Sequence, residues 1–362
     1  MKVLKFGGTS VGSAQRMKEV AKLITDGEQK IVVLSAMSGT TNTLVEISDY
    51  LYKKNPEGAN EIINRLEAKY KQHVNELYST DEYKQKTQEF IKAQFDYIRS
   101  YTKDIFTLFE EKVILAQGEL ISTNMVTNYL QEQGVNAILL PALEFMRTDK
   151  NSEPDPVYIK EKLAAQLEIH PDAEIYITQG FICRNAYGEI DNLQRGGSDY
   201  TASLIGAAVN ASEIQIWTDI DGMHDNDPRI VDKTSPVRHL HFEEAAELAY
   251  FGAKILHPTC VQPAKYANIP VRLLNTMEPT APGTLISNDT EKGKIKAVAA
   301  KDNITAIKIK SSRMLLAHGF LRKVFEIFES YQTSIDMICT SEVGVSVSID
   351  NTKHLNEILD DL

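Results

Sequence analysis

The sequence predicts an α/β fold, with a mostly parallel sheet covered by helices, followed by a small α+β module. Two observations support this prediction. Short, β-rich apolar runs alternate with amphipathic helical patterns along most of the chain, and the pattern restarts after a charged segment near residues 292–303. The length of 362 residues is enough for two or three domains. The strands expected in the large sheet are Val3–Phe6, Ile31–Ser35, Val135–Leu140, Ile175–Thr178 and Ile214–Thr218.

The first expected strand runs directly into a glycine pair, in the sequence Lys5-Phe-Gly-Gly-Thr-Ser10. Glycines let backbone N–H groups approach an anion closely, and the N-terminus of a following helix adds positive potential. With the lysine, this turn predicts a site for a polyphosphate. It is not a P-loop, because Ser13 stands where that motif has its lysine, although Gly7 and Gly12 keep the spacing. The alternative is an ordinary strand–turn–helix connection.

Several polar or glycine residues follow the predicted strands directly. Ligands of parallel sheets bind beyond the carboxyl ends of the strands. The Lys5 turn, Ser35, Gly180 and Thr218 all lie at such ends. We therefore expect them to line one crevice.

Residues 57–133 are predicted to be a helical insertion, because they are rich in Glu, Lys, Gln and Tyr and nearly free of Gly and Pro. Tyr70, Val74 and Leu77 keep a helical spacing within it. The favoured interpretation is a solvated bundle or a dimer surface rather than a binding site. Its second half contains Glu119, which we expect to return toward the crevice.

A second glycine pair occurs in Gln194-Arg-Gly-Gly-Ser-Asp199, directly before a helix expected over Tyr200–Val209. Ser198 is placed to cap that helix. The planar guanidinium of Arg195 suits a carboxylate, and Asp199 could hold a lysine in place or help to bind a metal. A capped helix with Arg195 in a surface ion pair is the alternative.

An aspartate-rich loop, Thr218–Arg229, follows the last strand of the expected sheet. Its four aspartates do not fit a calcium-binding EF-hand, because the required glycine and glutamate are out of register. A loop for a nucleotide and Mg²⁺ is favoured over a solvated acidic loop. Further along, Lys254 could neutralise charge on a transferring phosphoryl group, or simply favour a helix C-terminus. His257 is expected to pack or cap rather than to catalyse.

The last part of the chain has the pattern of a small βαββα module. Such a module usually closes with one further strand, so the pattern is incomplete. One face of its first helix carries Phe320, Val324, Ile327 and Phe328. The expected strands are 304–309, 334–338 and 343–349, and the expected helices are 316–331 and 355–362.

The composition excludes several classes of function. A net charge of −11 argues against general binding to nucleic acid or to anionic membranes, and no apolar run approaches transmembrane length. The three cysteines are far apart, so neither a zinc site nor a disulfide framework is expected, and each is interpreted as a small buried residue. The first residues do not resemble a signal peptide. We expect a cytoplasmic protein.

Six motifs in order resemble the aspartate kinases (aspartokinases) of the amino-acid kinase fold. They are Lys5-Phe-Gly-Gly-Thr-Ser, Gly118-Glu119, Arg195-Gly-Gly-Ser-Asp, Thr218-Asp-x-Asp-Gly, Asp227-Pro-Arg and Gly252-Ala-Lys-x-Leu-His-Pro. The resemblance covers essentially the whole chain. It implies a catalytic amino-acid kinase domain at 1–296, with 57–133 as its helical insertion, and a partial ACT-like regulatory domain at 302–362.

The implied activity is ATP-dependent phosphorylation of the side-chain carboxylate of L-aspartate to 4-phospho-L-aspartate. This reaction is the first step of lysine, threonine and methionine synthesis. ATP and Mg²⁺ are the implied cofactors, lysine or threonine is the implied allosteric effector, and a homodimer is implied because ACT units generally pair across chains. The attacking carboxylate is already ionised near neutral pH, so positioning and charge stabilisation should dominate the catalysis.

The resemblance also implies roles for individual residues. Lys5, Asp199 and Lys254 would be catalytic, and no protein ligand for the metal is implied. Ser35, Thr41, Glu119, Arg195 and Ser198 would bind aspartate, with Glu119 facing its ammonium and Arg195 a carboxylate. The nucleotide would contact Lys5, Phe6, Gly7, Gly8, Thr218, Asp219, His224, Asp227, Arg229 and Lys254. The effector segment resembles that of the lysine-sensitive type and would comprise Met314, Gly319, Phe320, Leu321, Ser334, Asp336, Ser341 and Glu342.

The sequence departs from the family pattern at three points. His224 replaces the usual tyrosine near the adenosine, Ala317 replaces a serine of the lysine-sensitive type, and one incomplete ACT-like unit stands where the family has two interleaved ones. The alternatives are a glutamate or carbamate kinase of the same fold, a catalytically silent amino-acid sensor, and the kinase part of an aspartokinase–homoserine dehydrogenase.

Overall fold

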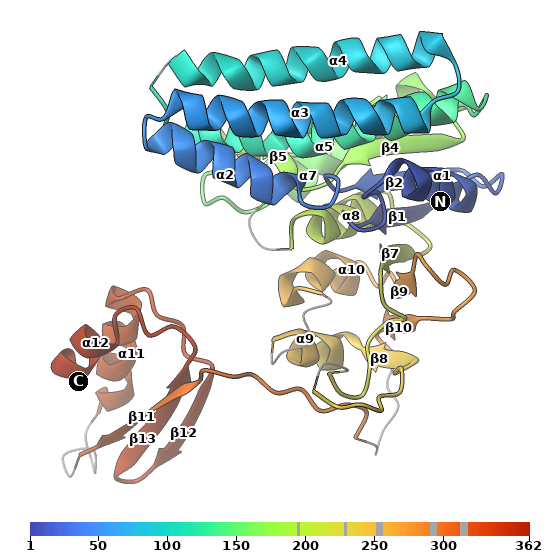
Figure 1. Cartoon of the computed structure of the whole chain (residues 1–362). Coiled ribbons are helices and arrows are strands. Elements are labelled where there is room, and N and C mark those ends of the chain that lie inside the picture. The colour runs from blue at the N-terminus through green and yellow to red at the C-terminus, as the bar shows by residue number, and fades with distance from the viewer. Residues whose placement is uncertain (104, 194–195, 228–229, 251–255, 290–294, 312–317) are drawn as a thin grey trace. The chain divides into compact units, whose positions relative to one another are not determined.

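The structure is a computed structural model of the chain and describes all residues except 104, 194–195, 228–229, 251–255, 290–294 and 312–317. The chain divides into two compact units, Met1–Ala299 and Ala300–Leu362 (Figure 1). The first unit contains two hydrophobic cores, and the second has a core of its own.

An eight-stranded sheet forms the centre of the first unit, with the strand order β3-β4-β2-β1-β7-β9-β10-β8. Its neighbouring strands are parallel except β9 and β10, which run antiparallel. The predicted mostly parallel sheet is therefore confirmed, and the sequence analysis missed β8–β10. The strands are β1 (Lys2–Phe6), β2 (Lys30–Leu34), β3 (Ala137–Leu140), β4 (Ile175–Gln179), β7 (Ile214–Thr218), β8 (His239–His241), β9 (Val271–Asn275) and β10 (Thr284–Ser287).

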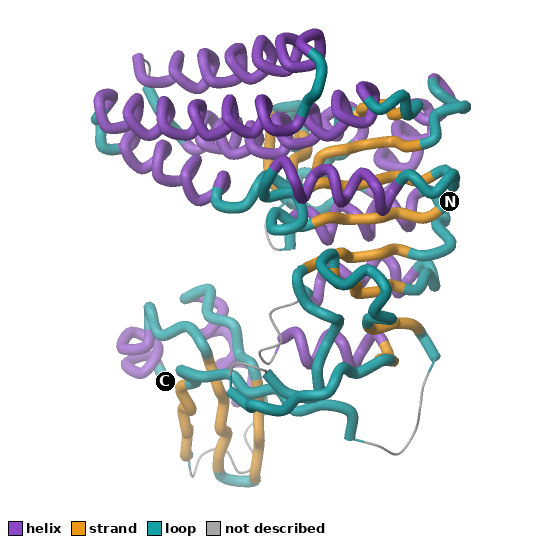
Figure 2. The backbone as a smooth tube through the Cα atoms, turned by 45° about the vertical axis from the view of Figure 1, so that its right-hand side comes forward, coloured by secondary structure: helices purple, strands orange, loops and turns teal. Residues whose placement is uncertain are grey.

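Helices cover both faces of the sheet, as Figure 2 shows along the backbone. A short hairpin of β5 (Ile182–Arg184) and β6 (Ile190–Asn192) lies outside the large sheet. One face is covered by α1 (Ala14–Ile24), α2 (Thr40–Tyr52), α3 (Pro56–Leu77), α4 (Asp81–Ser100) and α5 (Leu108–Glu132). The other is covered by α6 (Ala142–Phe145), α7 (Pro156–Ile169), α8 (Gly197–Ala208), α9 (Phe242–Tyr250) and α10 (Gln262–Tyr266), with the 3₁₀ turn Pro258–Val261.

Strand β1 lies inside the sheet, between β2 and β7, and its side chains alternate between the two cores. Leu4 and Phe6 pack in the core under α1–α5, whereas Val3 packs in the opposite core. Successive side chains of a strand point to opposite faces, so a strand covered on both sides must be apolar on both. The Phe6 ring also stacks on Trp217 of β7, with ring centroids 5.6 Å apart. This packing fixes the carboxyl end of β1.

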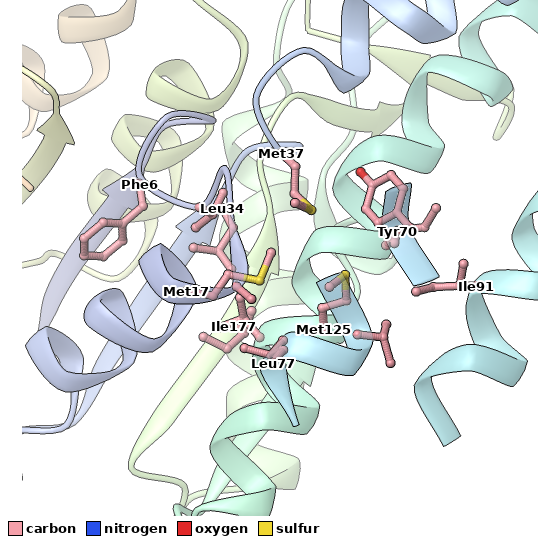
Figure 3. Close-up of a cluster of buried hydrophobic side chains, with 14 of the residues drawn as sticks. Phe6, Met17, Leu34, Met37, Tyr70, Leu77, Ile91, Met125 and Ile177 are labelled. Carbon is pink, nitrogen blue, oxygen red and sulfur yellow. The ribbon is translucent and has the colours of Figure 1, made fainter. Parts of the chain in front are cut away.

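The predicted insertion is helical and comprises α3 except its first residue, α4, the 3₁₀ turn Tyr101–Lys103 and all of α5. Asn55 caps α3 ahead of a proline in its first turn, and Thr107 with Glu110 forms a capping box at α5. Tyr70 and Leu77 are fully buried in the cluster drawn in Figure 3, where α3 packs against α4 and α5.

The second unit has the predicted βαββα order. It contains β11 (Thr305–Lys310), α11 (Phe320–Ser330), β12 (Met337–Ser341), β13 (Gly344–Ile349) and α12 (Leu355–Asp361). The three strands form an antiparallel sheet in the order β11-β13-β12. Strand β12 begins three residues later than predicted, because its pairing with β13 starts at Met337↔Ser348, and Ile335 packs against the core from the preceding connection.

The predicted burial of the cysteines is confirmed at two of the three positions. Cys183 and Cys260 are buried, and burial raises the pKa of each thiol to about 12. Cys339 is exposed, so its predicted burial is wrong. It lies on β12, an edge strand whose residues are all exposed. Over the described part of the chain, no helix is long and apolar enough to cross a membrane.

Candidate active site

Four neighbouring strands, in the order β4-β2-β1-β7, bring the predicted strand-end residues to one edge of the sheet. Lys5 is in register with Val33 of β2 and with Ile216 of β7. Ser35 follows β2, and Thr218 ends β7. The expected clustering of these ends is therefore observed, although Thr218 is not among the residues that line the cavity beside β1 and β2.

Lys5 and Asp199 form an ion pair at this edge. Lys5 Nζ lies 2.7 Å from Asp199 Oδ1, and the side chains are 12% and 15% exposed. Asp199 lies in the first turn of α8, which packs against β1. A mostly buried pair of this kind has little freedom, so the ammonium has a defined position at the end of β1.

The Gly7-Gly8 turn fits the close approach of a phosphate group. A Cβ on Gly7 would lie 3.4 Å from Lys5 Nζ, so no side chain stands between the turn and the ammonium. A Cβ on Gly8 would lie 2.8 Å from the carbonyl oxygen of Ala36, so this position accepts only glycine without movement. The turn is fixed by hydrogen bonds from Gly7 N to Trp217 O and from Ser38 N to Gly8 O.

A cavity of about 320 Å³ lies beside this turn. It contains four of the five residues predicted to bind aspartate, and the fifth, Arg195, lies outside the described residues. Its lining comprises Gly8, Ser35, Ala36, Met37, Ser38, Gly39, Thr41, Asn42, Glu119, Phe181, Gly197 and Ser198.

Ser198 is not the N-cap of α8, so that prediction is wrong. The helix begins at Gly197, and its N-cap is Gly196, in the left-handed conformation with φ of 74°. Ser198 is therefore inside the first turn, where its hydroxyl accepts a hydrogen bond from Ser35 Oγ at 2.9 Å. The close approach depends on Gly180, because a Cβ there would lie 2.3 Å from Ser198 Oγ.

Two helix N-termini meet at the cavity. Residues of the first turns of α2 and α8 line it, and the N-caps, Gly39 and Gly196, have no side chains with which to cap these helices. The first N–H groups of a helix have no partners within the helix and carry partial positive charge. The cavity therefore suits a small anion such as a carboxylate.

Glu119 supplies the carboxyl group of the cavity. It lies on α5, is 4% exposed, and accepts a hydrogen bond from Ala36 N through Oε1 at 3.1 Å. Its Oε2 is buried and has no hydrogen-bond partner among the described residues. Burial raises the pKa of this carboxyl to about 8. A buried carboxyl oxygen that lacks a partner is suited to an ammonium group of a ligand.

Sequence reasoning missed several cavity residues, notably Ser38, Gly39, Asn42 and Phe181. The small polar residues from Ser38 to Asn42, where α2 begins, are a helix-start signal that could have drawn attention to the first three. Phe181 has φ of 69°, which is unusual for a residue with a side chain, and its N–H donates to Thr201 Oγ1. The sequence does not indicate which residue other than glycine adopts a positive φ.

Apart from the four at the end of β1, the residues predicted to contact the nucleotide lie at the end of β7 or later in the sequence. Thr218 donates to Asp219 Oδ1 at 3.2 Å, and His224 Nδ1 lies 2.8 Å from Thr234 Oγ1. Asp227 is half-buried in the same loop. Two other aspartates stabilise the conformation of the loop itself. Asp221 forms an ion pair with Arg238, and Asp225 Oδ1 accepts a hydrogen bond from Ser235 N. Arg229 and Lys254 lie outside the described residues.

Two further predictions concern His257 and a metal. His257 caps the 3₁₀ turn after it, accepting from Thr259 N, as expected. Wherever the structure describes the chain, no group of three or more His, Cys, Asp and Glu side chains is placed to hold a metal ion.

The residues predicted to bind an effector all lie in the second unit. Gly319, Phe320 and Leu321 are at the start of α11, and Ser341 and Glu342 are at the turn between β12 and β13. Ser334 and Asp336 precede β12 and therefore lie at the opposite end of that strand from Ser341. Met314 lies outside the described residues.

Comparisons with known proteins show the family to which the chain belongs. Residues 1–275 match the amino acid kinase family. The chain is 38% identical to chloroplastic aspartokinase 1 of Arabidopsis thaliana, over 97% of this chain and 63% of the relative. It is 35% identical to lysine-sensitive aspartokinase 3 of Escherichia coli (strain K12), over 97% of this chain and 78% of the relative. The chain thus spans less than two thirds of the length of the plant relative.

A solved structure has the same fold along the chain. The crystal structure of E. coli aspartokinase III in complex with aspartate and ADP matches with a TM-score of 0.84 and 34% identity, over 97% of this chain and 79% of that one. The chain belongs to the amino acid kinase family, and the three proteins named above, which it matches along nearly all of its length, are aspartokinases.

Proposed function

We propose that the protein is an aspartate kinase, which transfers a phosphoryl group from ATP to the side-chain carboxylate of L-aspartate. The observation that carries this proposal is the juxtaposition of the Lys5–Asp199 ion pair with a cavity that contains the buried carboxyl of Glu119. The similarity to a structure determined with aspartate and ADP supports it. The product would be 4-phospho-L-aspartate, which opens lysine, threonine and methionine synthesis.

The cavity suits a small amino acid with two carboxylates. Glu119 Oε2 would accept a hydrogen bond from the substrate ammonium, and the N-termini of α2 and α8 would receive carboxylate oxygens. Ser35, Thr41 and Ser198 would add hydroxyl contacts from the cavity wall. Arg195 would bind a carboxylate through its guanidinium.

Phosphoryl transfer brings two anions together, so the residues at the end of β1 must offset their repulsion. Bound ATP with Mg²⁺ supplies the phosphoryl group. Lys5, held by Asp199, would stabilise the charge that develops on the transferring group, and the Gly7-Gly8 turn would allow its close approach. Lys254 would add a second positive charge. The substrate carboxylate is ionised near neutral pH, so no strong base is required.

The remaining nucleotide contacts would come from the end of β1 and from the segment after β7. Phe6 is fully buried and fixes the strand end through its stacking on Trp217. Thr218, Asp219, His224, Asp227 and Arg229 would face the nucleoside and its phosphates.

We also propose that 302–362 is a partial ACT-like regulatory domain that binds lysine or threonine. The lysine-sensitive E. coli relative supports lysine as the first effector to test. The effector residues would be Met314, Gly319, Phe320, Leu321, Ser334, Asp336, Ser341 and Glu342. A homodimer is proposed as well, because the exposed edge strand β12 offers unsatisfied backbone groups to a second strand.

The proposed function is tested by measuring ADP release with three acceptors: L-aspartate, L-glutamate, and bicarbonate with ammonia. We expect ADP release that depends on L-aspartate, together with an acyl phosphate that hydroxylamine traps. Glu119→Gln should raise the KM for L-aspartate strongly. Turnover only with another acceptor, or none with L-aspartate, would contradict the proposal.

A further inference from the structure

We propose that Lys69 and Tyr70 of the helical insertion are positioning residues for the substrate amino acid, because they hold the N-terminus of α2 in the cavity wall. The inference rests on the proposed function and extends it to α3, a helix that the sequence analysis interpreted as part of a solvated or dimer surface. Neither residue is among those that line the cavity.

Tyr70 reaches the start of α2 from the interior. Its hydroxyl lies 2.9 Å from Thr40 Oγ1, and both side chains are 1% exposed. A buried hydroxyl without a partner is costly, so each of these groups depends on the other. Tyr70 belongs to the same buried cluster as Met37, which precedes the helix and lines the cavity (Figure 3).

Lys69 reaches the same segment from the solvent side. Its ammonium donates to the carbonyl oxygen of Ser38 at 3.3 Å. Ser38 and Gly39 line the cavity, and Gly39 is the left-handed N-cap of α2 with φ of 81°. The contacts of Lys69 and Tyr70 therefore fall on the residues immediately before and after this turn. Lys69 and Tyr70 are adjacent residues of α3.

Helix α5 closes the remaining side. A Cβ on Gly118 would lie 2.7 Å from Ala36 Cβ and 3.3 Å from Thr40 Cγ2, so α5 is in tight contact with the segment that leads into α2. The next residue of α5 is Glu119, which bonds to Ala36 N. The start of α2 is thus held between α3 and α5, close to the carboxyl that would bind the substrate ammonium.

This arrangement sets the distance between the α2 N-terminus and Glu119. Under the proposed function, these two groups would bind opposite charges of the same amino acid. Loosening the helix start should therefore weaken binding of L-aspartate more than binding of ATP. Lys5 keeps its ion pair with Asp199 and Gly7 its hydrogen bond to Trp217 O, and among the described residues only the bond from Ser38 N to Gly8 O links the Gly7-Gly8 turn to the segment before α2. The expected signature is a change in the KM for L-aspartate without a matching change in the KM for ATP.

Matched variants test the inference in the full chain. Tyr70→Phe removes the hydroxyl that contacts Thr40, whereas Tyr78→Phe removes an equally buried hydroxyl that donates to Met125 O at 2.7 Å. Lys69→Gln is compared with Lys86→Gln, because Lys86 makes a contact of the same 3.3 Å length to Gln131 on the far part of α5. Thermal unfolding of each variant reports any general loss of stability.

We expect Tyr70→Phe to raise the KM for L-aspartate about fivefold and Lys69→Gln about twofold, with kcat nearly unchanged and a smaller change in the KM for ATP. Tyr78→Phe and Lys86→Gln should leave all three constants near those of the wild type, even where the melting temperature falls. If each variant behaves like its control while the wild type phosphorylates L-aspartate, the inference is wrong and the proposed function stands. A wild type without aspartate-dependent turnover overturns both.

Discussion

The ammonium of Lys5 lies 2.7 Å from the carboxylate of Asp199, although the two residues belong to β1 and to the first turn of α8. The pair stands where the central strand of the sheet runs into its glycine turn. A fixed positive charge at this position suits a phosphoryl group better than a free lysine would, because little ordering is needed at the moment of reaction.

Removing the ammonium should abolish most of the activity without unfolding the protein. We expect Lys5→Ala to lower kcat about 100- to 1,000-fold, since it deletes a charge contact to the transition state. Lys112→Ala is a suitable control, because Lys112 forms an ion pair of the same 2.7 Å length with Asp191 elsewhere. Steady-state kinetics of both variants, with circular dichroism to verify folding, would check this. Near-normal turnover of a folded Lys5→Ala protein would exclude the proposed role.

Asp199 should act through the position of Lys5. Asp199→Asn keeps the size of the side chain but removes the charge that fixes the ammonium, so we expect kcat to fall about tenfold while the KM for L-aspartate changes little. Asp191→Asn breaks the comparable ion pair of Lys112 and should leave kcat unchanged. Equal kcat values for the two variants would argue against a positioning role.

Position 8 of the Gly7-Gly8 turn should tolerate no side chain. A Cβ at Gly8 would lie 2.8 Å from a backbone oxygen, that of Ala36, so Gly8→Ala must displace the turn and should lower kcat/KM for ATP more than tenfold. Gly188→Ala places its Cβ in open space but strains a backbone with φ of 86°. It should cost about 1 kcal/mol of stability and leave the kinetics intact. The comparison separates the loss of the phosphate turn from general strain.

The buried carboxyl of Glu119 should make stability depend on pH. Burial raises its pKa to about 8, so between about pH 5 and 8 the folded protein holds a proton that the unfolded chain has released. The free energy of unfolding of the ligand-free protein should therefore fall as pH rises through this window, by about 1 kcal/mol per pH unit. Denaturant titrations at several pH values would measure the slope, and Glu119→Gln should flatten it. An equal slope in both proteins would contradict the assignment.

The same carboxyl should make substrate affinity depend on pH in the opposite direction. The substrate ammonium would bind the ionised form of Glu119, which becomes more populated as pH approaches 8. The KM for L-aspartate should therefore fall as pH rises from 6 to 8, by at most about tenfold per pH unit. In Glu119→Gln the KM should be high and nearly independent of pH. A KM that rises over this range in the wild type would rule out the proposed contact.

The parts of the site that follow from strand order could be predicted from the sequence. Short apolar runs placed Lys5, Ser35 and Thr218 at carboxyl ends of parallel strands, and the sheet brings those ends together. Glu119 could not be placed in this way, because it lies on a long helix whose return to the sheet depends on packing within the insertion. The sequence analysis expected its return toward the crevice, but only the family resemblance implied its role.

Other features depend on local backbone conformation that the sequence does not specify. The start of α8 shifted because Gly196 adopts a left-handed conformation, which moved Ser198 from the cap into the first turn. The edge position of β12 exposed Cys339, since an apolar pattern does not reveal which strand lies at the edge. The Tyr70–Thr40 contact joins two helices and leaves no periodic signal.

A crystal structure with L-aspartate, Mg²⁺ and a non-hydrolysable ATP analogue would test most directly whether one site binds both reactants. We expect L-aspartate in the cavity with its ammonium against Glu119 and its side-chain carboxylate toward Lys5, and the terminal phosphate beside the Gly7-Gly8 turn. Electron density for either ligand at another place, with this cavity empty, would contradict the account.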